Sequence, residues 1–183
     1  YILEGENILA VKVDNSKQPD SRWYTGAGIY RHVWLITSSP VYVAQWGTFV
    51  TTPVVSEKEA SVNVQTTIAN DTQDKTNLSI LSSVLDDSGK EVATQKQSVK
   101  ASANSKTEVK TNLKVISPKL WDIENPNLYK LVTKVFQGKD LKDTYTTTFG
   151  IRSIAFRADS GFYLNGKNVK ILGVCNHHDL GSL

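Results

Sequence analysis

The residues with the greatest potential for chemistry stand together near the end of the sequence, where VKILGV is followed by Cys175, Asn176, His177, His178 and Asp179. Imidazole and carboxylate groups can bind a ligand, transfer protons or hold a metal ion. A polar turn that happens to contain histidine is the alternative, and the clustering leaves both interpretations open. If VKILGV is a strand of a (β/α)8 barrel, the cluster lies at the strand end where such barrels place their sites.

Metal binding and nucleophilic catalysis are poorly supported by the spacing. Cys175 and His177 would share one face of a strand, but a zinc site needs further ligands, and His32 is the only other histidine outside this cluster. Cys175 is more typical of a small buried apolar residue than of a catalytic thiol. The sequence has no Gly-x-Ser-x-Gly elbow, and the Gly-x-Gly of TGAGIYR lacks the preceding βαβ context of a nucleotide site. We therefore predict no metal and no cofactor.

Alternation of apolar and polar residues with a period of two dominates the chain and predicts strands rather than helices. Turn sequences rich in Gly, Asn, Asp and Pro separate these strands. About seven short strands in some 110 residues are typical of an immunoglobulin-like antiparallel β-sandwich, which we place at residues 41–149. Its predicted strands are VYVAQW, residues 62–68 and 78–84, EVATQKQSV, residues 107–115, LYKLVTKVF and DTYTTTF.

The two flanks of this predicted sandwich have a different character. Residues 1–40 contain the apolar stretches NILAVKVDN and HVWLI, which predict strands, around a loop with Trp23, Tyr24 and Tyr30. We expect these aromatics to fill a contact between domains, with stacking on sugar rings as the alternative. We expect Trp34, Trp46 and Trp121 to lie in the core or in such a contact. Residues 150–183 predict a hairpin around LNGKN, because Asn-Gly is a strong hairpin signal. VKILGV is continuously apolar, as in a strand buried on both faces.

Composition excludes several classes of partner. The net charge of +3 is spread along the chain without a block of like charges, so we expect no nucleic acid and no membrane partner. A hydrophobic content of 39% is ordinary for a globular protein, and one cysteine excludes an internal disulfide. The composition is compatible with a homo-oligomer. The first residues begin within a strand pattern, so we expect the chain to belong to something longer.

Several segments resemble glycoside hydrolase family 2, the β-galactosidases, β-glucuronidases and β-mannosidases, and they occur in the family's order. GENILAVKVDN and SRWYTGAGIYRHVWL resemble the end of the sugar-binding jelly roll, and LWDIENPNLYKL resembles the crossing late in the immunoglobulin-like domain. FGIRSIAFRADSGFYLNGKNVKILGVCNHHD is similar to the start of the catalytic barrel. The resemblance implies jelly roll in residues 1–40, sandwich in 41–149 and barrel in 150–183, most similar to a β-galactosidase.

The family cleaves β-linked sugars with retention, using two glutamates on later barrel strands, so the resemblance implies no catalytic residue in this chain. The glutamates present are Glu4, Glu6, Glu57, Glu59, Glu91, Glu108 and Glu124. His177 matches the first-strand histidine that contacts the hydroxyls of the cleaved sugar. Asn176, His178 and Asp179 would adjoin it, and Asp20 stands near a jelly-roll loop that reaches the sugar in some members.

Two functions from different classes follow. In the first, the chain is the inactive connecting part of a glycosidase whose substrate is a β-linked sugar or oligosaccharide. In the second, it is a free-standing carbohydrate-binding or adhesion module whose aromatic side chains form the contact surface.

Overall fold

The computed structural model describes residues 4–14, 29 and 32–174. Residues Thr37–Leu172 form one compact unit, and residues 4–14, 29 and 32–36 belong to another. In the first unit the chain is built of antiparallel strands, and the part of the chain that the structure describes contains no helix. No segment there is therefore a helix long and apolar enough to cross a membrane.

The seven predicted strands of the sandwich are confirmed, each longer than or shifted slightly from its predicted range. They are β1 (Val41–Val55), β2 (Glu59–Asn70), β3 (Thr76–Leu85), β4 (Glu91–Ala101), β5 (Ser105–Ile116), β6 (Tyr129–Gln137) and β7 (Asp140–Phe149). Three of the turns between them contain a residue type that readily adopts the backbone conformation found there. Gly89, Asn104 and Gly138 have φ values of 84°, 47° and 63°, in the left-handed region that glycine and asparagine favour.

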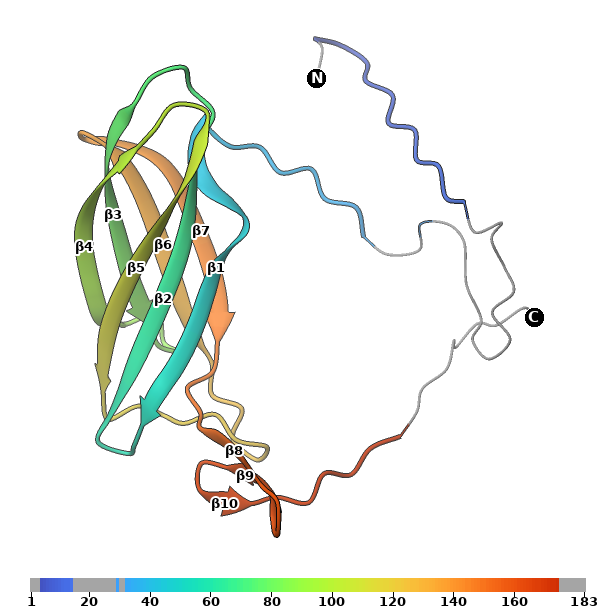
Figure 1. Cartoon of the computed structure of the whole chain (residues 1–183), viewed down its shortest axis with the longest axis vertical. Coiled ribbons are helices and arrows are strands. Elements are labelled where there is room, and N and C mark those ends of the chain that lie inside the picture. The colour runs from blue at the N-terminus through green and yellow to red at the C-terminus, as the bar shows by residue number, and fades with distance from the viewer. Residues whose placement is uncertain (1–3, 15–28, 30–31, 175–183) are drawn as a thin grey trace. The chain divides into compact units, whose positions relative to one another are not determined.

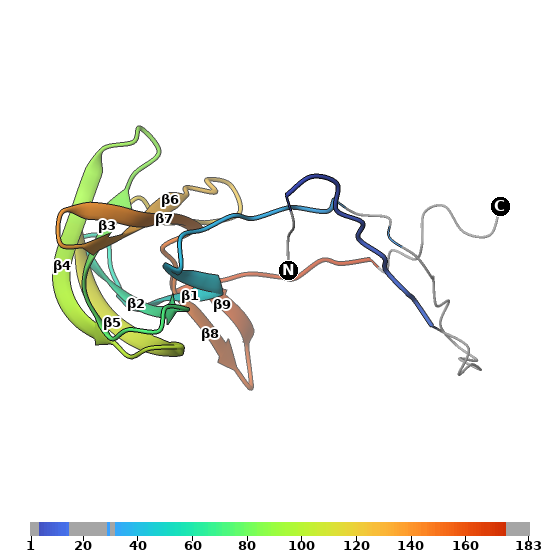
Figure 2. The same cartoon turned by 90° about the horizontal axis from the view of Figure 1, so that it is seen from above.

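Two antiparallel sheets pack face to face as a β-sandwich (Figures 1 and 2). One sheet has the order β1-β2-β5 and the other the order β4-β3-β6-β7. The chain therefore changes sheet after β2, after β4 and again after β5. Sheets packed in this way bury the alternate residues that face one another and leave the others to solvent.

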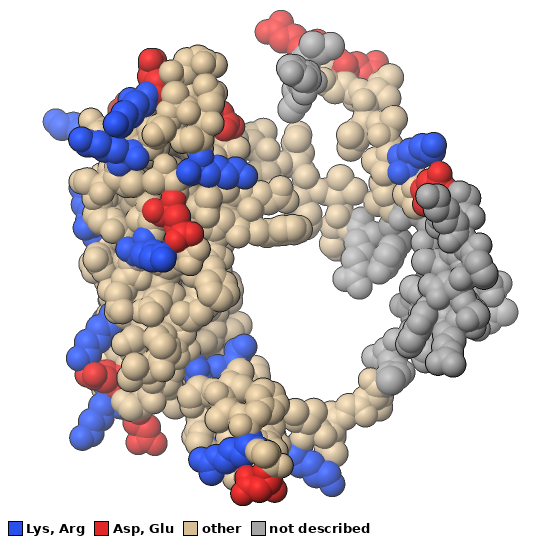
Figure 3. Space-filling view, in the orientation of Figure 1, with Lys and Arg blue, Asp and Glu red and all other residues tan. Residues whose placement is uncertain are grey.

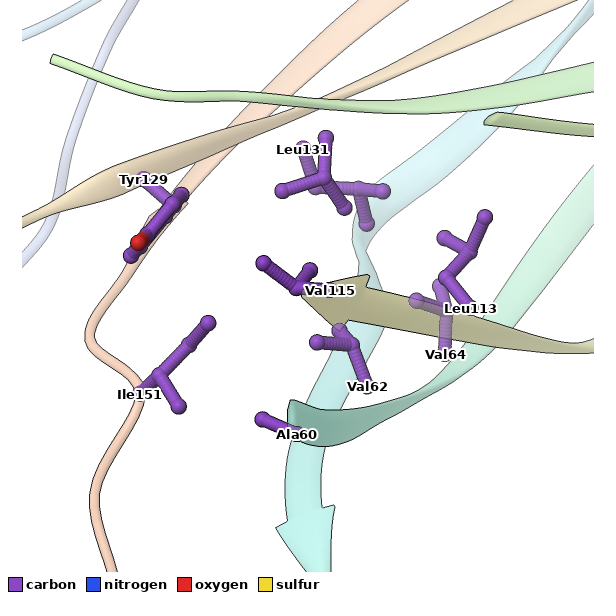
Figure 4. Packing of buried hydrophobic residues seen from close by; sticks show 9 residues of the cluster. Ala60, Val62, Val64, Leu113, Val115, Tyr129, Leu131 and Ile151 are labelled. Carbon is purple, nitrogen blue, oxygen red and sulfur yellow. The ribbon is translucent and has the colours of Figure 1, made fainter. Parts of the chain in front are cut away.

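The core contains two apolar clusters. In the cluster of Figure 4, residues of β2 and β5 such as Val62 and Val115 face Leu131 and Tyr129 of β6. Ile151, which follows β7, is fully buried in the same cluster. The second cluster contains Val41, Val43, Ile68, Leu78, Ile80, Ala101, Val109 and Val135. The sandwich has no cysteine between its sheets, so this apolar packing holds the sheets together.

A layer of buried hydroxyls lies between the two clusters. On β2, β3, β5 and β6 the inward residue between the clusters is Thr66, Ser82, Thr111 and Thr133, respectively. The Thr111 hydroxyl accepts a hydrogen bond from Gln97 Nε2. The other three hydroxyls have no partner among the described residues. Burying a hydroxyl without a partner is unfavourable, so this layer lowers the stability of the core.

Replacing Thr133 by valine, which has nearly the same shape, is expected to raise the free energy of unfolding by about 1 kcal/mol. The matched control is Thr111→Val, which removes the acceptor of Gln97 and is expected to lower that free energy by about 1 kcal/mol. Urea denaturation of both variants measures the difference. Equal effects of the two substitutions would show that the missing partner of Thr133 has no energetic consequence.

A β-bulge interrupts β1, an edge strand, between Val43 and Thr48. Trp46 adopts a φ of 52° there, which is unusual for a bulky residue. A Cβ on Gly47 would lie 2.6 Å from the Ala44 carbonyl oxygen, so the bulge requires glycine at this position. The main-chain N–H of Val43, just before the bulge, donates to Asp143 Oδ2 at 2.8 Å.

The prediction that Trp46 and Trp34 lie in the core is wrong, because their side chains are 86% and 78% exposed. The bulge explains Trp46, since the extra residues turn its side chain out of the alternating pattern. The other prediction, that Trp46 and Trp34 fill a contact between domains, stays a prediction. Trp121 is half-buried and is described below.

The predicted hairpin around LNGKN is confirmed. It forms within a small antiparallel sheet of β8 (Ile154–Arg157), β9 (Gly161–Leu164) and β10 (Lys167–Asn168), with β9 in the centre. Asn165 and Gly166 have φ values of 49° and 77°, and positive φ at both central residues is the mark of a type I′ turn.

Three other predicted strands are corrected. NILAVKVDN and HVWLI contain no strand in residues 7–14 and 32–36, and VKILGV contains none in residues 169–174. Their apolar side chains are exposed; Leu9 and Leu172, for example, are 80% and 81% exposed. The apolar pattern is present, but a strand also needs a neighbouring strand. Apart from the Val169 N–H, which donates to the Phe162 carbonyl, no strand pairs with these segments in the part of the chain described. The jelly-roll and barrel assignments of the flanks stay predictions.

Candidate functional site

The residues predicted to bind sugar, Asp20, Asn176, His177, His178 and Asp179, all lie outside the described residues, as does Cys175. The aromatics Trp23, Tyr24 and Tyr30 lie outside them too. Their predicted roles therefore stay predictions. The structure does describe the segment that leads toward residues 175–179, and how that segment is fixed to the sandwich.

That fixation is a junction at the end of the sandwich, formed by Trp121, Gly150, Ile151, Arg152, Ser153 and Asn165. Trp121 belongs to the crossing between β5 and β6, residues 150–153 follow β7, and Asn165 is in the β9–β10 turn. Three separate segments of the chain thus meet here. We call this set the junction.

Hydrogen bonds connect the segment after β7 to the crossing and to β1. The Trp121 N–H donates to the Ile151 carbonyl at 2.8 Å, and Thr52 Oγ1 of β1 donates to the Arg152 carbonyl at 2.9 Å. Ile151 anchors the segment between these bonds, because its side chain is fully buried in the core. The strand pairing of β7 ends at Phe149, yet the following residues continue along a fixed path.

Asn165 joins the small sheet to the rest of the junction with three hydrogen bonds. Its main-chain N–H donates to the Ser153 carbonyl at 2.9 Å, and its Oδ1 accepts from the Ser153 N–H at 2.9 Å. Its Nδ2 donates to the Trp121 carbonyl at 3.0 Å. One side chain in a tight turn therefore ties the hairpin both to the segment after β7 and to the crossing.

Close packing completes the junction. A Cβ on Gly150 would lie 2.8 Å from Trp121 Cβ and 2.9 Å from Trp121 Cγ, so the indole packs directly on the glycine backbone. The Arg152 guanidinium also lies 4.7 Å from the centre of the Trp121 ring, within the range of a cation–π contact. The Arg152 side chain therefore packs on the indole of Trp121.

A cavity of about 600 Å³ adjoins the junction. It is lined by Val50, Thr52, Pro53, Leu128, Thr148, Phe149, Gly150, Arg152, Ser153 and Ile154. The lining has no carboxylate, imidazole or thiol, so it holds no base that could activate its Ser and Thr hydroxyls as nucleophiles. Across the described ranges, no three His, Cys, Asp or Glu residues gather in a way that could hold a metal ion.

Polar contacts of Lys119 hold the crossing in place just before Trp121. The Lys119 N–H donates to the buried Tyr129 hydroxyl at 2.8 Å. Its ammonium group lies 3.2 Å from Asp87, and this hydrogen-bonded pairing raises the pKa of Lys119. In the β3–β4 turn, the hydrogen bond from the Ser88 hydroxyl lowers the pKa of Asp86, with smaller contributions from the N–H groups of Lys90 and Ser88. Both groups are at the surface, where such pairs add little to stability.

The sequence predicts Trp121 only as a core residue or a contact between domains, and it does not identify Arg152 or Asn165 as its partners. The Asn-Gly pair signalled a turn, but Asn165 contacts Trp121 across 44 positions of sequence. A turn signal is local and carries no information about such a contact.

Comparison with known proteins finds relatives along nearly the whole chain. The family model described as "Glycosyl hydrolases family 2" matches residues 41–152, which include all seven sandwich strands and the start of the junction. The chain is 49% identical over 177 residues to the "Beta-galactosidase BoGH2A" of Bacteroides ovatus, covering 97% of this chain and 21% of that protein. It is 38% identical over 182 residues to a "Putative beta-glucuronidase" of Formosa agariphila, covering 99% of this chain and 17% of that protein.

Solved structures agree with this placement. A glycosyl hydrolase family 2 member from Bacteroides cellulosilyticus superimposes with a TM-score of 0.82 at 43% identity, covering 86% of this chain and 20% of that one. A β-glucuronidase of the same family superimposes with a TM-score of 0.70 at 30% identity, covering 73% of this chain. The chain spans about a fifth of the length of the curated relatives it matches.

Proposed function

Because the chain belongs to glycosyl hydrolase family 2, we propose that it is the connecting portion of a retaining β-glycosidase of the β-galactosidase type. The observation that carries this proposal is the 49% identity to a β-galactosidase along 97% of the chain. A free-standing binding module would not need to resemble a hydrolase beyond the sandwich itself. Here the match extends well past residues 41–152 on both sides.

In this proposal the immunoglobulin-like sandwich is a rigid spacer between a sugar-binding jelly roll and a catalytic barrel. The junction supports that role, because Ile151 is buried in the core and Asn165 ties the hairpin to the crossing. Residues held in this way transmit the orientation of the sandwich to whatever follows the hairpin. Positioning of this kind matters in enzymes, since an error of about 1 Å in the placement of a reacting group can cost about 100-fold in rate.

The sugar-binding role belongs to residues beyond the hairpin. We propose that His177 binds hydroxyls of the cleaved sugar, with Asn176, His178 and Asp179 beside it and Asp20 contributed by the jelly roll. Retaining hydrolysis also requires two carboxyl groups, a general acid and a nucleophile, about 5–5.5 Å apart. In this proposal the catalytic barrel supplies both carboxyl groups from outside residues 1–183. Residues 1–183 alone are therefore inactive.

The test is hydrolysis of aryl β-galactoside, β-glucuronide and β-mannoside by the full-length protein and by residues 1–183. We expect the full-length protein to cleave the galactoside best and residues 1–183 to cleave none of the three. In the full-length protein, His177→Ala is expected to reduce kcat/KM by about 100-fold, as the loss of hydrogen bonds worth several kcal/mol in the transition state requires. His32→Ala is the matched control and should leave kcat/KM within about twofold of the wild type.

The outcomes separate the alternatives. Full-length protein without activity on any of the three glycosides would contradict the proposal. Cleavage by residues 1–183 alone would contradict the spacer role, because it would require catalytic groups within this chain.

A further inference from the structure

The outward face of the β1-β2-β5 sheet carries an unusual set of side chains at its centre. Strand register aligns Phe49 with Gln65 and Lys110, and Thr51 with Asn63 and Asn112. These six residues form two adjacent rows across three strands. Their inward neighbours, such as Val64 and Val109, lie in the core, so the rows face away from it.

The rows line a shallow groove of about 370 Å³. Phe49 stands on its β1 side and is 64% exposed. An aromatic ring of this size is usually buried, and its exposure beside a groove indicates a contact surface. In the view of Figure 3 the surface over the middle of β1 and β2 lacks charged side chains, which gather instead toward the β4 and β5 side.

Amide groups form the floor of the groove. Asn112 Nδ2 donates to Asn63 Oδ1 at 2.6 Å, which fixes the orientation of both side chains. The amide Nδ2 of Asn63 and the amide Oδ1 of Asn112 then remain as a donor and an acceptor toward the groove. Gln65 is oriented in the same way, because its Nε2 donates to Glu108 and its Oε1 is left to accept.

The one cation of the groove has its charge offset. Lys110 Nζ lies 3.4 Å from Glu108 Oε1, so the groove offers little net charge to an anionic ligand. Its amide donors and acceptors would be left without partners under an apolar protein surface, which makes such a partner unfavourable. The ligand that fits is therefore neutral, has one apolar face for Phe49, and has neighbouring hydroxyls that both donate and accept.

We propose that this groove binds a neutral oligosaccharide of β-linked pyranoses, with one sugar ring on Phe49 and its hydroxyls on Asn63 and Asn112. The apolar C–H face of a pyranose matches an exposed aromatic ring, and a pair of neighbouring hydroxyls matches preoriented amides. The groove shares no residue with the cluster 175–179, and its binding does not depend on the proposed hydrolysis. In a glycosidase it would hold a chain of sugars through residues other than those proposed to contact the cleaved sugar.

The test is a titration of 15N-labelled residues 1–183 with β-1,4-galactotriose, followed by amide chemical shifts. We expect concentration-dependent shifts on β1, β2 and β5 around Phe49, Asn63 and Asn112. Phe49→Ala is expected to weaken binding at least tenfold, and Asn112→Ala about threefold to tenfold. The matched control is Phe156→Ala, another phenylalanine, 76% exposed on β8, which should leave the affinity unchanged.

Each other outcome overturns the proposal. Absence of saturable shifts with the trisaccharide, in protein whose spectrum shows the native dispersion, would do so. Shifts that persist in Phe49→Ala, or that Phe156→Ala abolishes equally, would place any binding elsewhere. The result is independent of the hydrolysis assay, because a full-length protein that cleaves galactosides can lack this groove binding, and the reverse also holds.

Discussion

Replacing Asn70 by alanine is expected to lower the free energy of unfolding of this chain by about 2–4 kcal/mol. Asn70 ends β2 and is fully buried. Its Nδ2 donates to the carbonyls of Asp74 and Ser102, each at 2.9 Å. Its Oδ1 accepts from the N–H and hydroxyl of Thr72, at 3.1 and 2.6 Å. Alanine would leave these buried and half-buried groups without partners, and urea denaturation measures the loss.

Two further variants make the result specific. Asn77 is an exposed asparagine on the neighbouring strand β3, and Asn77→Ala should change the free energy of unfolding by less than about 0.5 kcal/mol. Asn70→Asp keeps the shape but replaces two donors by an acceptor that faces carbonyls, so it should destabilise at least as much as alanine. A loss below about 0.5 kcal/mol for Asn70→Ala would mean that the connection between β2 and β3 does not depend on this amide.

The second large effect is expected at the junction, where Gly150→Ala should lower the free energy of unfolding by about 1–3 kcal/mol. The added methyl group would lie 2.8 Å from Trp121 Cβ, which is the rigid base of the side chain rather than its mobile end. The Trp121 crossing must then move, and the bonds from Trp121 to Ile151 and Asn165 must stretch. In a full-length enzyme, the same change should reduce kcat/KM, because it displaces the hairpin that precedes His177.

Gly173→Ala is the control for this change, since a Cβ at Gly173 meets nothing within 4 Å. A double-mutant cycle identifies the contact directly: in a Trp121→Ala background, Gly150→Ala should cost less than in the wild type. Equal costs in the two backgrounds would show that the destabilisation arises from the backbone at residue 150 and not from the indole.

The sandwich could be predicted because its signals are local and repeated. The inward residues of β2, from Val62 to Ile68, alternate with polar residues, and Gly89, Asn104 and Gly138 supply the positive φ of three turns. The hairpin at Asn165 and Gly166 was predictable for the same reason. The strands predicted in the flanks were wrong, since the apolar pattern around Leu9 and Leu172 indicates which side chains a strand would bury but supplies no partner strand.

The candidate site was predictable only in part. The cluster at residues 176–179 is visible in the sequence, but its role depends on neighbours that the sequence pattern does not specify. The junction and the groove arise from contacts between distant positions. Asn112 and Asn63 are 49 residues apart, and only the pairing of β2 with β5 brings their amides together. The exposure of Trp46 depends on a bulge, whose extra residues no alternating pattern reveals.

The bulge of β1 also bears on aggregation. An unpaired strand edge is a template for another chain, and β1, β5, β4 and β7 are the edge strands of the two sheets. On β1 the bulge interrupts the regular strand edge, and Pro53 has no N–H to donate. The N–H of Val43 already donates to the Asp143 carboxylate. On β5 the exposed lysines 106, 110 and 114 recur along the outward face. These features disfavour edge-to-edge stacking of copies, so the sandwich should remain dispersed at concentrations where a flat, regular β-sheet would form fibrils.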